Sequence, residues 1–172
     1  MEKSNILTIV IPVKNPLDID SFISGNKIYL EKYNVIVIDS NGAGKELKGY
    51  SSYINKEMSM TQARKVGYSL VITPYTLNLD VDTILPNNFI DFALSLLKNK
   101  NVVVVAIDYE NCQGHYAFGT SLWKTDILKK LYDYKEGNIL CECIFMWRKV
   151  LQNKNKIETL PLRAIHLKEM IK

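Results

Sequence analysis

The segment "ILTIVIPV", residues 6–13, decides the fold class together with a similar segment, "YNVIVIDS", at residues 33–40. Both are continuous runs of apolar, largely β-branched residues that end in turn-forming residues, a pattern typical of strands buried on both faces. Residues 16–32 between them carry apolar side chains at helical spacing, which predicts a crossover helix. This strand, helix, strand order favours two parallel strands of one sheet.

The same alternation continues along the chain. It predicts a helix over 59–70 with Ser59 as its N-cap, a strand that carries Asp80, a helix over 87–97 and a strand over 101–108. After these come an irregular segment at 114–121, helices near 124–132 and 138–151, and a short strand at 156–162. We therefore expect an α/β fold with an open, mostly parallel (mixed) sheet flanked by helices, in which ligands bind beyond the carboxyl ends of the strands.

Length and composition exclude several classes of protein. A chain of 172 residues that is 47% apolar is suited to one domain over residues 1–172 with a substantial core. The net charge of +4 comes from 22 basic and 18 acidic residues that are scattered, which argues against a nucleic-acid partner. No apolar run is long enough to span a membrane, and the N-terminus lacks a signal-peptide core, so we expect a cytoplasmic protein without a transmembrane segment.

The cysteines leave two interpretations open. Their number is odd and Cys112, Cys141 and Cys143 have no framework spacing, which favours reduced thiols. The alternative is a zinc site that Cys112 and His115 form with the other two thiols, although Cys-x-Cys on a helix directs its thiols apart.

Two carboxylates are separated by a single residue in "YTLNLDVDTILPNNF", residues 75–89. In an extended strand, side chains at positions i and i+2 point to the same side, so Asp80 and Asp82 would converge. Two converging carboxylates repel each other unless a cation or a hydrogen-bond donor lies between them. The pair therefore predicts a positively charged partner.

Asp39 ends the predicted strand at 33–40 and precedes the glycine-rich segment "SNGAGKELKG". A phosphate-binding P-loop is excluded, because Asp39 stands where its first glycine is needed and Glu46 stands where Ser or Thr is needed. The glycines favour a turn between strand and helix. The Asp39 carboxylate could accept hydrogen bonds from a nucleobase or ribose, or it could cap that turn.

Several of these segments resemble, in the same order, the sequence blocks of family-2-type glycosyltransferases with the GT-A fold. The matching blocks are "TIVIPVKN", "VIVIDSNG", "TQARKVGYSLVITPYTLNLDVDTILP" and "CECIFMWRKVLQNKNKIETLPLRAIH". The resemblance covers nearly the whole chain. It implies a nucleotide-binding half at residues 1–108 and an acceptor and catalytic half at residues 109–172.

The resemblance also implies which residues contact the nucleotide. The first strand ends in a Pro-x-x-Asn turn of the family's nucleotide pocket, matched by Pro12 and Asn15, with Val13 between them as a further binding residue. The aspartate that ends the second strand, Asp39, matches a position that contacts the base. Arg64 matches an arginine that faces the nucleotide, and its alternative is a solvated helix arginine. Lys14 stands where the family often has an aromatic residue that stacks on the base, so the identity of the donor stays open.

The family's Asp-x-Asp signature falls on Asp80 and Asp82, and the resemblance implies that they bind a divalent cation, Mn²⁺ or Mg²⁺, together with the nucleotide diphosphate. Asp80 belongs to both the nucleotide and the metal site. His166 matches a histidine that completes the metal site in the family. A lone histidine is otherwise a surface or core residue.

The catalytic base implied by the resemblance is Glu142, six residues before Arg148 in a degraded form of the family's acidic motif. Its alternative is a glutamate that the helix dipole favours at a helix start. The implied reaction is an inverting transfer from a nucleotide-sugar donor to an unidentified acceptor hydroxyl. Three aromatic residues, His115, Tyr116 and Trp123, could stack on a sugar or belong to the core.

The short second half predicts that acceptor recognition depends on another chain or on contact with a membrane surface. Two other classes compete with the glycosyltransferase interpretation. A sugar nucleotidyltransferase should have a glycine-rich basic loop near the N-terminus, and "PVKNPLDID" lacks one. A non-catalytic GT-A-like nucleotide-binding module is favoured by the small size and the degraded acidic motif. For a transferase, we expect five residues to line one cleft: Pro12, Asp39, Arg64, Asp80 and Asp82.

Overall fold

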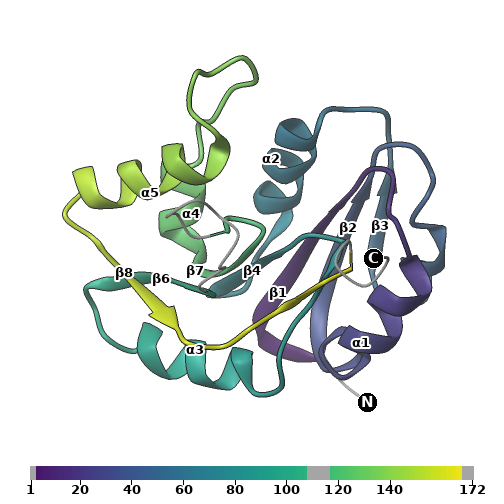
Figure 1. Ribbon diagram of the computed structural model, residues 1–172, viewed down its shortest axis with the longest axis horizontal. Helices are drawn as coiled ribbons and strands as arrows, with labels where there is room; N and C mark the ends of the chain where they lie inside the picture. The colour runs from purple at the N-terminus through teal and green to yellow at the C-terminus, as the bar shows by residue number, and fades with distance from the viewer. Residues whose placement is uncertain (1–2, 108–116, 168–172) are drawn as a thin grey trace.

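The computed structural model describes residues 3–107 and 117–167, and within these ranges a seven-stranded main sheet is flanked by helices (Figure 1). The strands of this sheet are β1 (Ser4–Val13), β2 (Tyr33–Asp39), β3 (Ser52–Asn55), β4 (Tyr75–Leu79), β6 (Val102–Ile107), β7 (Thr120–Lys124) and β8 (Lys156–Leu160). The helices are α1 (Ile19–Lys32), η1 (Lys45–Gly49), α2 (Met60–Leu70), α3 (Phe89–Leu97), α4 (Thr125–Leu131) and α5 (Glu142–Gln152).

The order of the strands in the sheet is β3-β2-β1-β4-β7-β6-β8, and β7 alone of these runs antiparallel to its neighbours. The predicted mostly parallel, mixed α/β sheet is therefore confirmed. Val13 pairs with Asp39 across β1 and β2, and Val10 pairs with Asn78 across β1 and β4. This register places the carboxyl ends of β1, β2 and β4 at the same edge of the sheet.

The sequence prediction was wrong around strand β7, because it gave an irregular segment at 114–121 followed by a helix from about residue 124. Residues 120–124 instead form a buried strand between β4 and β6. The strand is only five residues long, and its partners are far away in the sequence, so its conformation depends on tertiary pairing rather than on a local pattern. The edge strand β3, which is partly polar, was also not predicted.

The helices cover the two faces of the sheet, with α1 and α3 on one face and α2, α4 and α5 on the other (Figure 1). Alternate side chains of β1 contribute to two different cores: Ile9 packs with α1 and α3, whereas Val10 packs with α2 and its neighbours. This alternation explains why the sequence shows a continuous apolar run, because both faces of the strand are buried.

Local signals set the helix ends. Ser59 and Gln62 form a capping box at the start of α2, so the predicted N-cap is confirmed. Helix α5 begins at Glu142 rather than near 138, and the Cys141 thiol accepts the backbone N–H of Ile144 as its N-cap. Glu142 is consequently the first residue of its helix.

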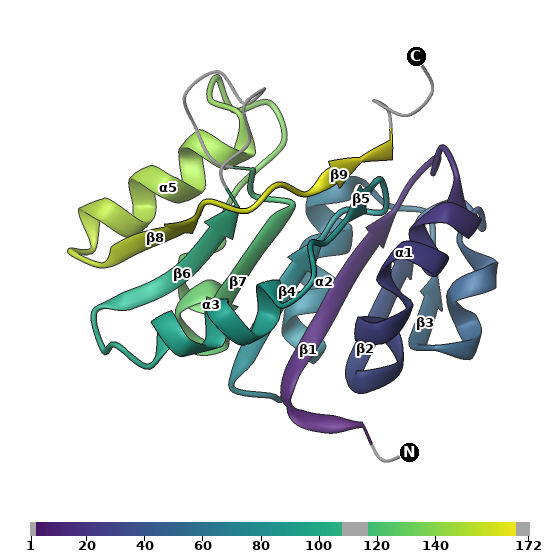
Figure 2. The ribbon, with the colours of Figure 1, turned by 60° about the horizontal axis from the view of Figure 1, so that its bottom comes forward.

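A second sheet pairs β5 (Thr83–Ile84) with β9 (Ile165–His166), to which the chain leads after β8 (Figure 2). The buried Asn26 of α1 fixes this region. Its amide donates to the carbonyl of Thr83, and its side-chain oxygen accepts the N–H of Leu85. The C-terminal segment is thereby held beside the turn that follows β4.

None of the described helices is long and apolar enough to cross a membrane.

Close packing of α2 on the sheet predicts the effect of a methyl group at Gly67. A Cβ at this position would overlap the side chain of Val10, a β-branched residue in the centre of the sheet. We expect Gly67→Ala to lower the free energy of unfolding by about 1–3 kcal/mol, the usual cost of overpacking, despite the better helix propensity of alanine. Urea denaturation checks this. Gly49→Ala is the matched control, because a Cβ there meets no atom within 4 Å. Equal denaturation midpoints for both variants would contradict the packing argument.

Candidate active site

Asp80 lies directly after β4, at the carboxyl edge of the sheet. Its N–H donates to the carbonyl of Gly119 at 2.8 Å, and its own carbonyl accepts the N–H of Thr83 at 3.1 Å. Residues 80–83 thus form a turn. The expectation that Asp80 and Asp82 share one side of an extended strand is wrong, because the strand ends at Leu79 and the alternation of side chains ends with it.

The positive partner expected for the two carboxylates is present for Asp80 and is an arginine of this chain. Arg64, on α2, places Nη2 at 2.6 Å from Asp80 Oδ1. Its Nη1 donates to Oε2 of Glu142, at the start of α5. Arg64 is only 8% exposed, so the alternative of a solvated helix arginine is wrong. Three residues predicted for the site, 78 positions apart at the extremes, are therefore in direct contact.

Electrostatics keep this arginine charged. Burial on its own would lower the pKa of Arg64, but the nearby Asp80 and Glu142 carboxylates more than offset it and hold the pKa above its usual value. The guanidinium also lies 5.5 Å from the centre of the Phe118 ring, within the range of a cation–π contact. Arg64 is thus a permanent buried cation between two acids.

Glu142 has a second hydrogen-bond donor in addition to Arg64. The hydroxyl of Tyr132 donates to its Oε1. Burial raises the pKa of Glu142, while Arg64 and the Tyr132 hydrogen bond act in the opposite direction, and the net pKa is raised. A carboxylate with a raised pKa at a sheet edge is suited to take up a proton. The position at a helix start, which was the alternative interpretation, is also observed.

Gly119 lets the backbone approach Asp80 closely. A Cβ on Gly119 would overlap the Asp80 carboxylate, so only glycine fits beside it. Phe118, the preceding residue, stacks on the ring of Tyr132 with centroids 5.8 Å apart and an interplanar angle of 8°. Gly119, Phe118 and Tyr132 were not predicted as site residues from the sequence. An isolated glycine beside a strand is the signal that could have indicated Gly119.

Asp82 and His166 meet on the other side of the turn. His166 Nε2 lies 3.2 Å from Asp82 Oδ2, and the N–H of Leu167 donates to the carbonyl of Asp82. His166 therefore lies beside one of the two aspartates, and its role as a metal ligand stays a prediction. Across residues 3–107 and 117–167, however, no three His, Cys, Asp or Glu side chains form a cluster that could hold a metal ion. Asp80 is directed to Arg64 instead of joining this pair.

Asp39 caps a turn in this structure. Its carboxylate accepts the N–H groups of Asn41, Gly42 and Gly44 at 2.7–3.1 Å and the hydroxyl of Tyr53. Burial raises the pKa of Asp39, but these hydrogen bonds together lower it below its usual value. The side chain has no exposed surface, so a nucleotide would reach it only if the turn opened. The turn role left open by the sequence is the one observed.

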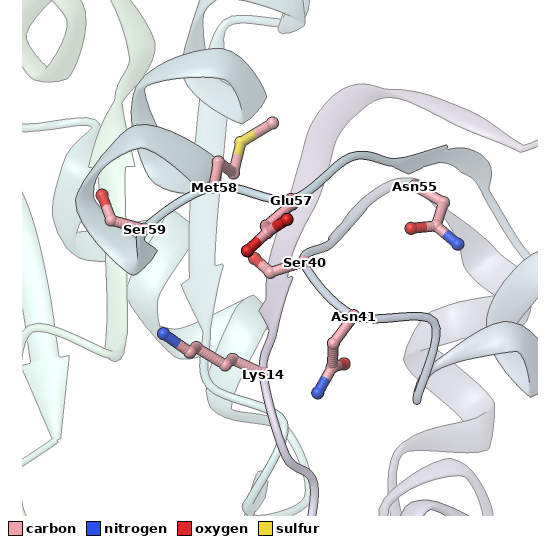
Figure 3. Close-up of a pocket in the computed structure, with 7 residues that line it drawn as sticks. All are labelled: Lys14, Ser40, Asn41, Asn55, Glu57, Met58 and Ser59. Atoms are coloured by element: carbon pink, nitrogen blue, oxygen red, sulfur yellow. The ribbon is translucent and has the colours of Figure 1, made fainter.

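Pro12 and Val13 are buried at the end of β1, where Val13 lies against Gly44. Beside them is an open pocket of about 660 Å³, lined by residues that follow β1, β2 and β3 and lead into α2 (Figure 3). It is lined by Lys14, Ser40, Asn41, Asn55, Glu57, Met58 and Ser59. None of the five residues expected to line one cleft is among them, although all five lie near the same sheet edge.

Other candidates have structural roles or lie outside the described residues. Trp123 is fully buried and stacks on Trp147 at 5.5 Å, which makes it a core residue rather than a sugar-binding one. The Cys143 thiol accepts the N–H of Phe118. Cys112, His115 and Tyr116 lie outside the described residues. The zinc alternative and sugar stacking by His115 and Tyr116 are therefore not tested.

Comparisons with known proteins identify the fold. No family model and no curated protein match the sequence, so membership of family 2 stays a prediction. The structure resembles mannosyltransferase PcManGT from Pyrobaculum calidifontis, solved with GDP-Man and Mn²⁺, with a TM-score of 0.74 and 14% identity over 90% of this chain and 54% of that one.

Two further solved structures share this architecture. TarS from S. aureus, residues 1–349, has a TM-score of 0.66 at 14% identity over 92% of this chain and 58% of that one. Bifunctional IspDF from Campylobacter jejuni has a TM-score of 0.63 at 12% identity over 95% and 53%. This chain thus spans little more than half the length of each of the three proteins. At such identities the likeness shows the fold, which is the GT-A-like α/β fold expected from the sequence.

The hydrogen bond from Tyr132 to Glu142 predicts a pKa change. In Tyr132→Phe the ring keeps its stacking on Phe118, but Glu142 loses a donor that favours its charged form. We expect the pKa of Glu142 to rise further, measured from the ¹³C shift of its carboxyl carbon against pH, with a loss of roughly 1 kcal/mol in stability. Tyr134→Phe is the control, because that hydroxyl donates to the Leu140 carbonyl. A Glu142 titration curve identical to wild type in Tyr132→Phe would contradict the assignment.

Proposed function

We propose that this protein is a metal-dependent glycosyltransferase, inverting in mechanism, that transfers a sugar from a nucleotide-sugar donor to an acceptor hydroxyl. The observation that carries the proposal is the contact of Arg64 with both Asp80 and Glu142 at the carboxyl edge of a GT-A-like sheet. Ligands of open α/β sheets bind at this edge. The solved complex of the similarly folded PcManGT with GDP-Man and Mn²⁺ supports both the donor class and the metal.

Asp82 and His166 would hold the divalent cation, Mn²⁺ or Mg²⁺. A carboxylate oxygen and an imidazole nitrogen 3.2 Å apart are suitable first ligands for Mn²⁺, and diphosphate oxygens would complete the coordination. The resemblance also assigns Asp80 to the metal site, but in this structure its Oδ1 is bound by Arg64 and it does not join the Asp82–His166 pair. When bound, the cation would neutralise charge on the leaving nucleoside diphosphate.

Glu142 would act as the general base that takes the proton of the acceptor hydroxyl. Arg64 and Tyr132 hold its two oxygens in place, which fixes the direction in which a lone pair faces. Burial raises the pKa of Glu142 towards neutral pH, which makes the carboxylate a better proton acceptor. The remaining rate enhancement would come from aligning donor and acceptor at this edge.

Residues 1–108 would bind the donor, with the turn after β1, the Asp39 loop and α2 beside the nucleotide. Residues 109–172 would supply catalysis and acceptor contacts. We place the protein in the cytoplasm, where nucleotide sugars serve as donors, and expect another chain or a membrane surface to complete acceptor recognition.

The metal assignment makes a direct prediction. Asp82→Asn removes one anionic ligand without changing shape, so metal-dependent binding of a nucleoside diphosphate should be lost while thermal unfolding of the unliganded protein changes little. Calorimetric titration with and without Mn²⁺ measures this. Asp91→Asn, an exposed acid of α3, is the control of equal charge change. Unchanged Mn²⁺-dependent affinity in Asp82→Asn would remove Asp82 from the metal site.

The base assignment predicts a separation of turnover from binding. Glu142→Gln keeps the shape of the side chain but only one of the two oxygen acceptors that Arg64 and Tyr132 use, and it cannot take a proton at neutral pH. We expect sugar transfer to fall by roughly two to four orders of magnitude, with donor affinity nearly unchanged. Transfer is measured at a temperature where circular dichroism shows the variant folded, with Glu136→Gln as the exposed control. Near-wild-type transfer would return Glu142 to a structural role at the helix start and leave the general base to another residue.

A further inference from the structure

The proposed function gives no role to the individual side chains that line the pocket of Figure 3. The pocket lies where β1, β2 and β3 end and α2 begins, and its volume of about 660 Å³ is within the range of small-molecule sites. Under the proposed function, on which this inference rests, it is the part of the donor site nearest the Asp39 loop. The nucleoside of the donor is therefore its natural occupant.

Six of the seven side chains that line this pocket are polar, among them Glu57, Lys14 and Ser40. Glu57 and Lys14 are exposed side chains that line it from the β3–α2 loop and from the turn after β1 (Figure 3). Ser40 also lines it, is 6% exposed, and has a buried hydroxyl without a hydrogen-bond partner among the described residues. Buried hydroxyl groups nearly always have a partner in folded proteins, so Ser40 marks a position where a ligand atom can complete the bonding.

We infer that this pocket selects guanine as the base of the nucleotide donor, with Glu57 binding the N1–H and N2–H groups and Lys14 binding O6. A carboxylate offers two adjacent acceptors and no donor, and guanine presents two adjacent donors on its Watson–Crick edge. The third group of that edge is the O6 acceptor, which is complementary to an ammonium.

The same pairing discriminates against the other bases. Uracil offers one donor, N3–H, between two carbonyl oxygens, so the second oxygen of Glu57 would face O2 and be repelled. Cytosine and adenine present ring nitrogen acceptors where guanine has N1–H, and a carboxylate cannot donate to them. Lys14 alone would not separate guanine from uracil, because both offer a carbonyl oxygen. The discrimination therefore belongs to Glu57.

Met58 supplies an apolar surface in the same pocket. Its thioether is polarisable and packs favourably against aromatic rings, which gives a contact for the face of a purine. Lys14 stands where the resemblance implies an aromatic stacking residue, and in this chain it lines the pocket as a polar group. The base would thus be recognised by its edge more than by ring stacking.

Calorimetry with four nucleoside diphosphates in the presence of Mn²⁺ tests the inference: GDP, IDP, UDP and ADP. IDP is the informative probe, because its base keeps O6 and N1–H but lacks the 2-amino group. We expect GDP to bind about tenfold more tightly than IDP and more tightly still than UDP or ADP. Equal affinity for GDP and IDP, or a preference for UDP or ADP, overturns the inference.

The variant Glu57→Gln locates the effect. Glutamine retains one acceptor and adds a donor, so GDP affinity should fall by about tenfold and the ratio of GDP to IDP affinity should approach one. Glu31→Gln, the same change on the exposed face of α1, should leave that ratio at its wild-type value. Thermal unfolding confirms that both variants fold. A GDP-to-IDP ratio that survives in Glu57→Gln removes Glu57 from base recognition.

Failure of this inference differs from failure of the proposed function. If none of the four nucleotides binds with Mn²⁺, the guanine assignment is wrong, and if CDP and dTDP also fail to bind, the proposed function is wrong as well. If a nucleotide binds in a manner that Asp82→Asn abolishes, but without preference for guanine, the donor site stands and only the base assignment is wrong.

Discussion

One buried guanidinium determines how the rest of this molecule is arranged. Arg64 reaches from α2 to Asp80 after β4 and to Glu142 at the start of α5, so a single cation connects three elements that are remote in sequence. A buried charge is tolerated only when it is paired, and removing one partner of such a pair typically costs about 3–5 kcal/mol. The position of α5 relative to the sheet therefore follows from electrostatics as well as from apolar packing.

Steric constraints act on the same aspartate from the opposite side. Strand β7 begins beside the end of β4, and Gly119 brings its backbone so close to Asp80 that a side chain has no room. The carboxylate is consequently fixed between a glycine and an arginine. The ring of Phe118 stacks on the ring of Tyr132, and the Tyr132 hydroxyl donates to Glu142. Residues that look like core aromatics thus set the geometry of the two acids.

The two aspartates of the Asp-x-Asp segment have different surroundings as a result. Asp80 belongs to the buried network of Arg64, whereas Asp82 faces His166 and the C-terminal strand β9. This division pairs one acid with the Arg64 guanidinium and leaves the other beside the imidazole of His166. The turn at residues 80–83 produces it, because an extended strand would have placed both side chains together.

Sequence alone determined the fold class and most of the candidate residues. Continuous apolar runs such as 6–13 and 33–40 predict strands that are buried on both faces. The capping residues of α2 predict a helix start, because they form hydrogen bonds with nearby backbone groups. Tertiary structure decided what each residue contacts. The short strand β7, the ion pairs of Arg64 and the enclosure of Asp39 by its own turn depend on neighbours far along the chain or on a specific loop conformation. A local pattern gives a residue's type and place in an element, but only packing fixes its partners.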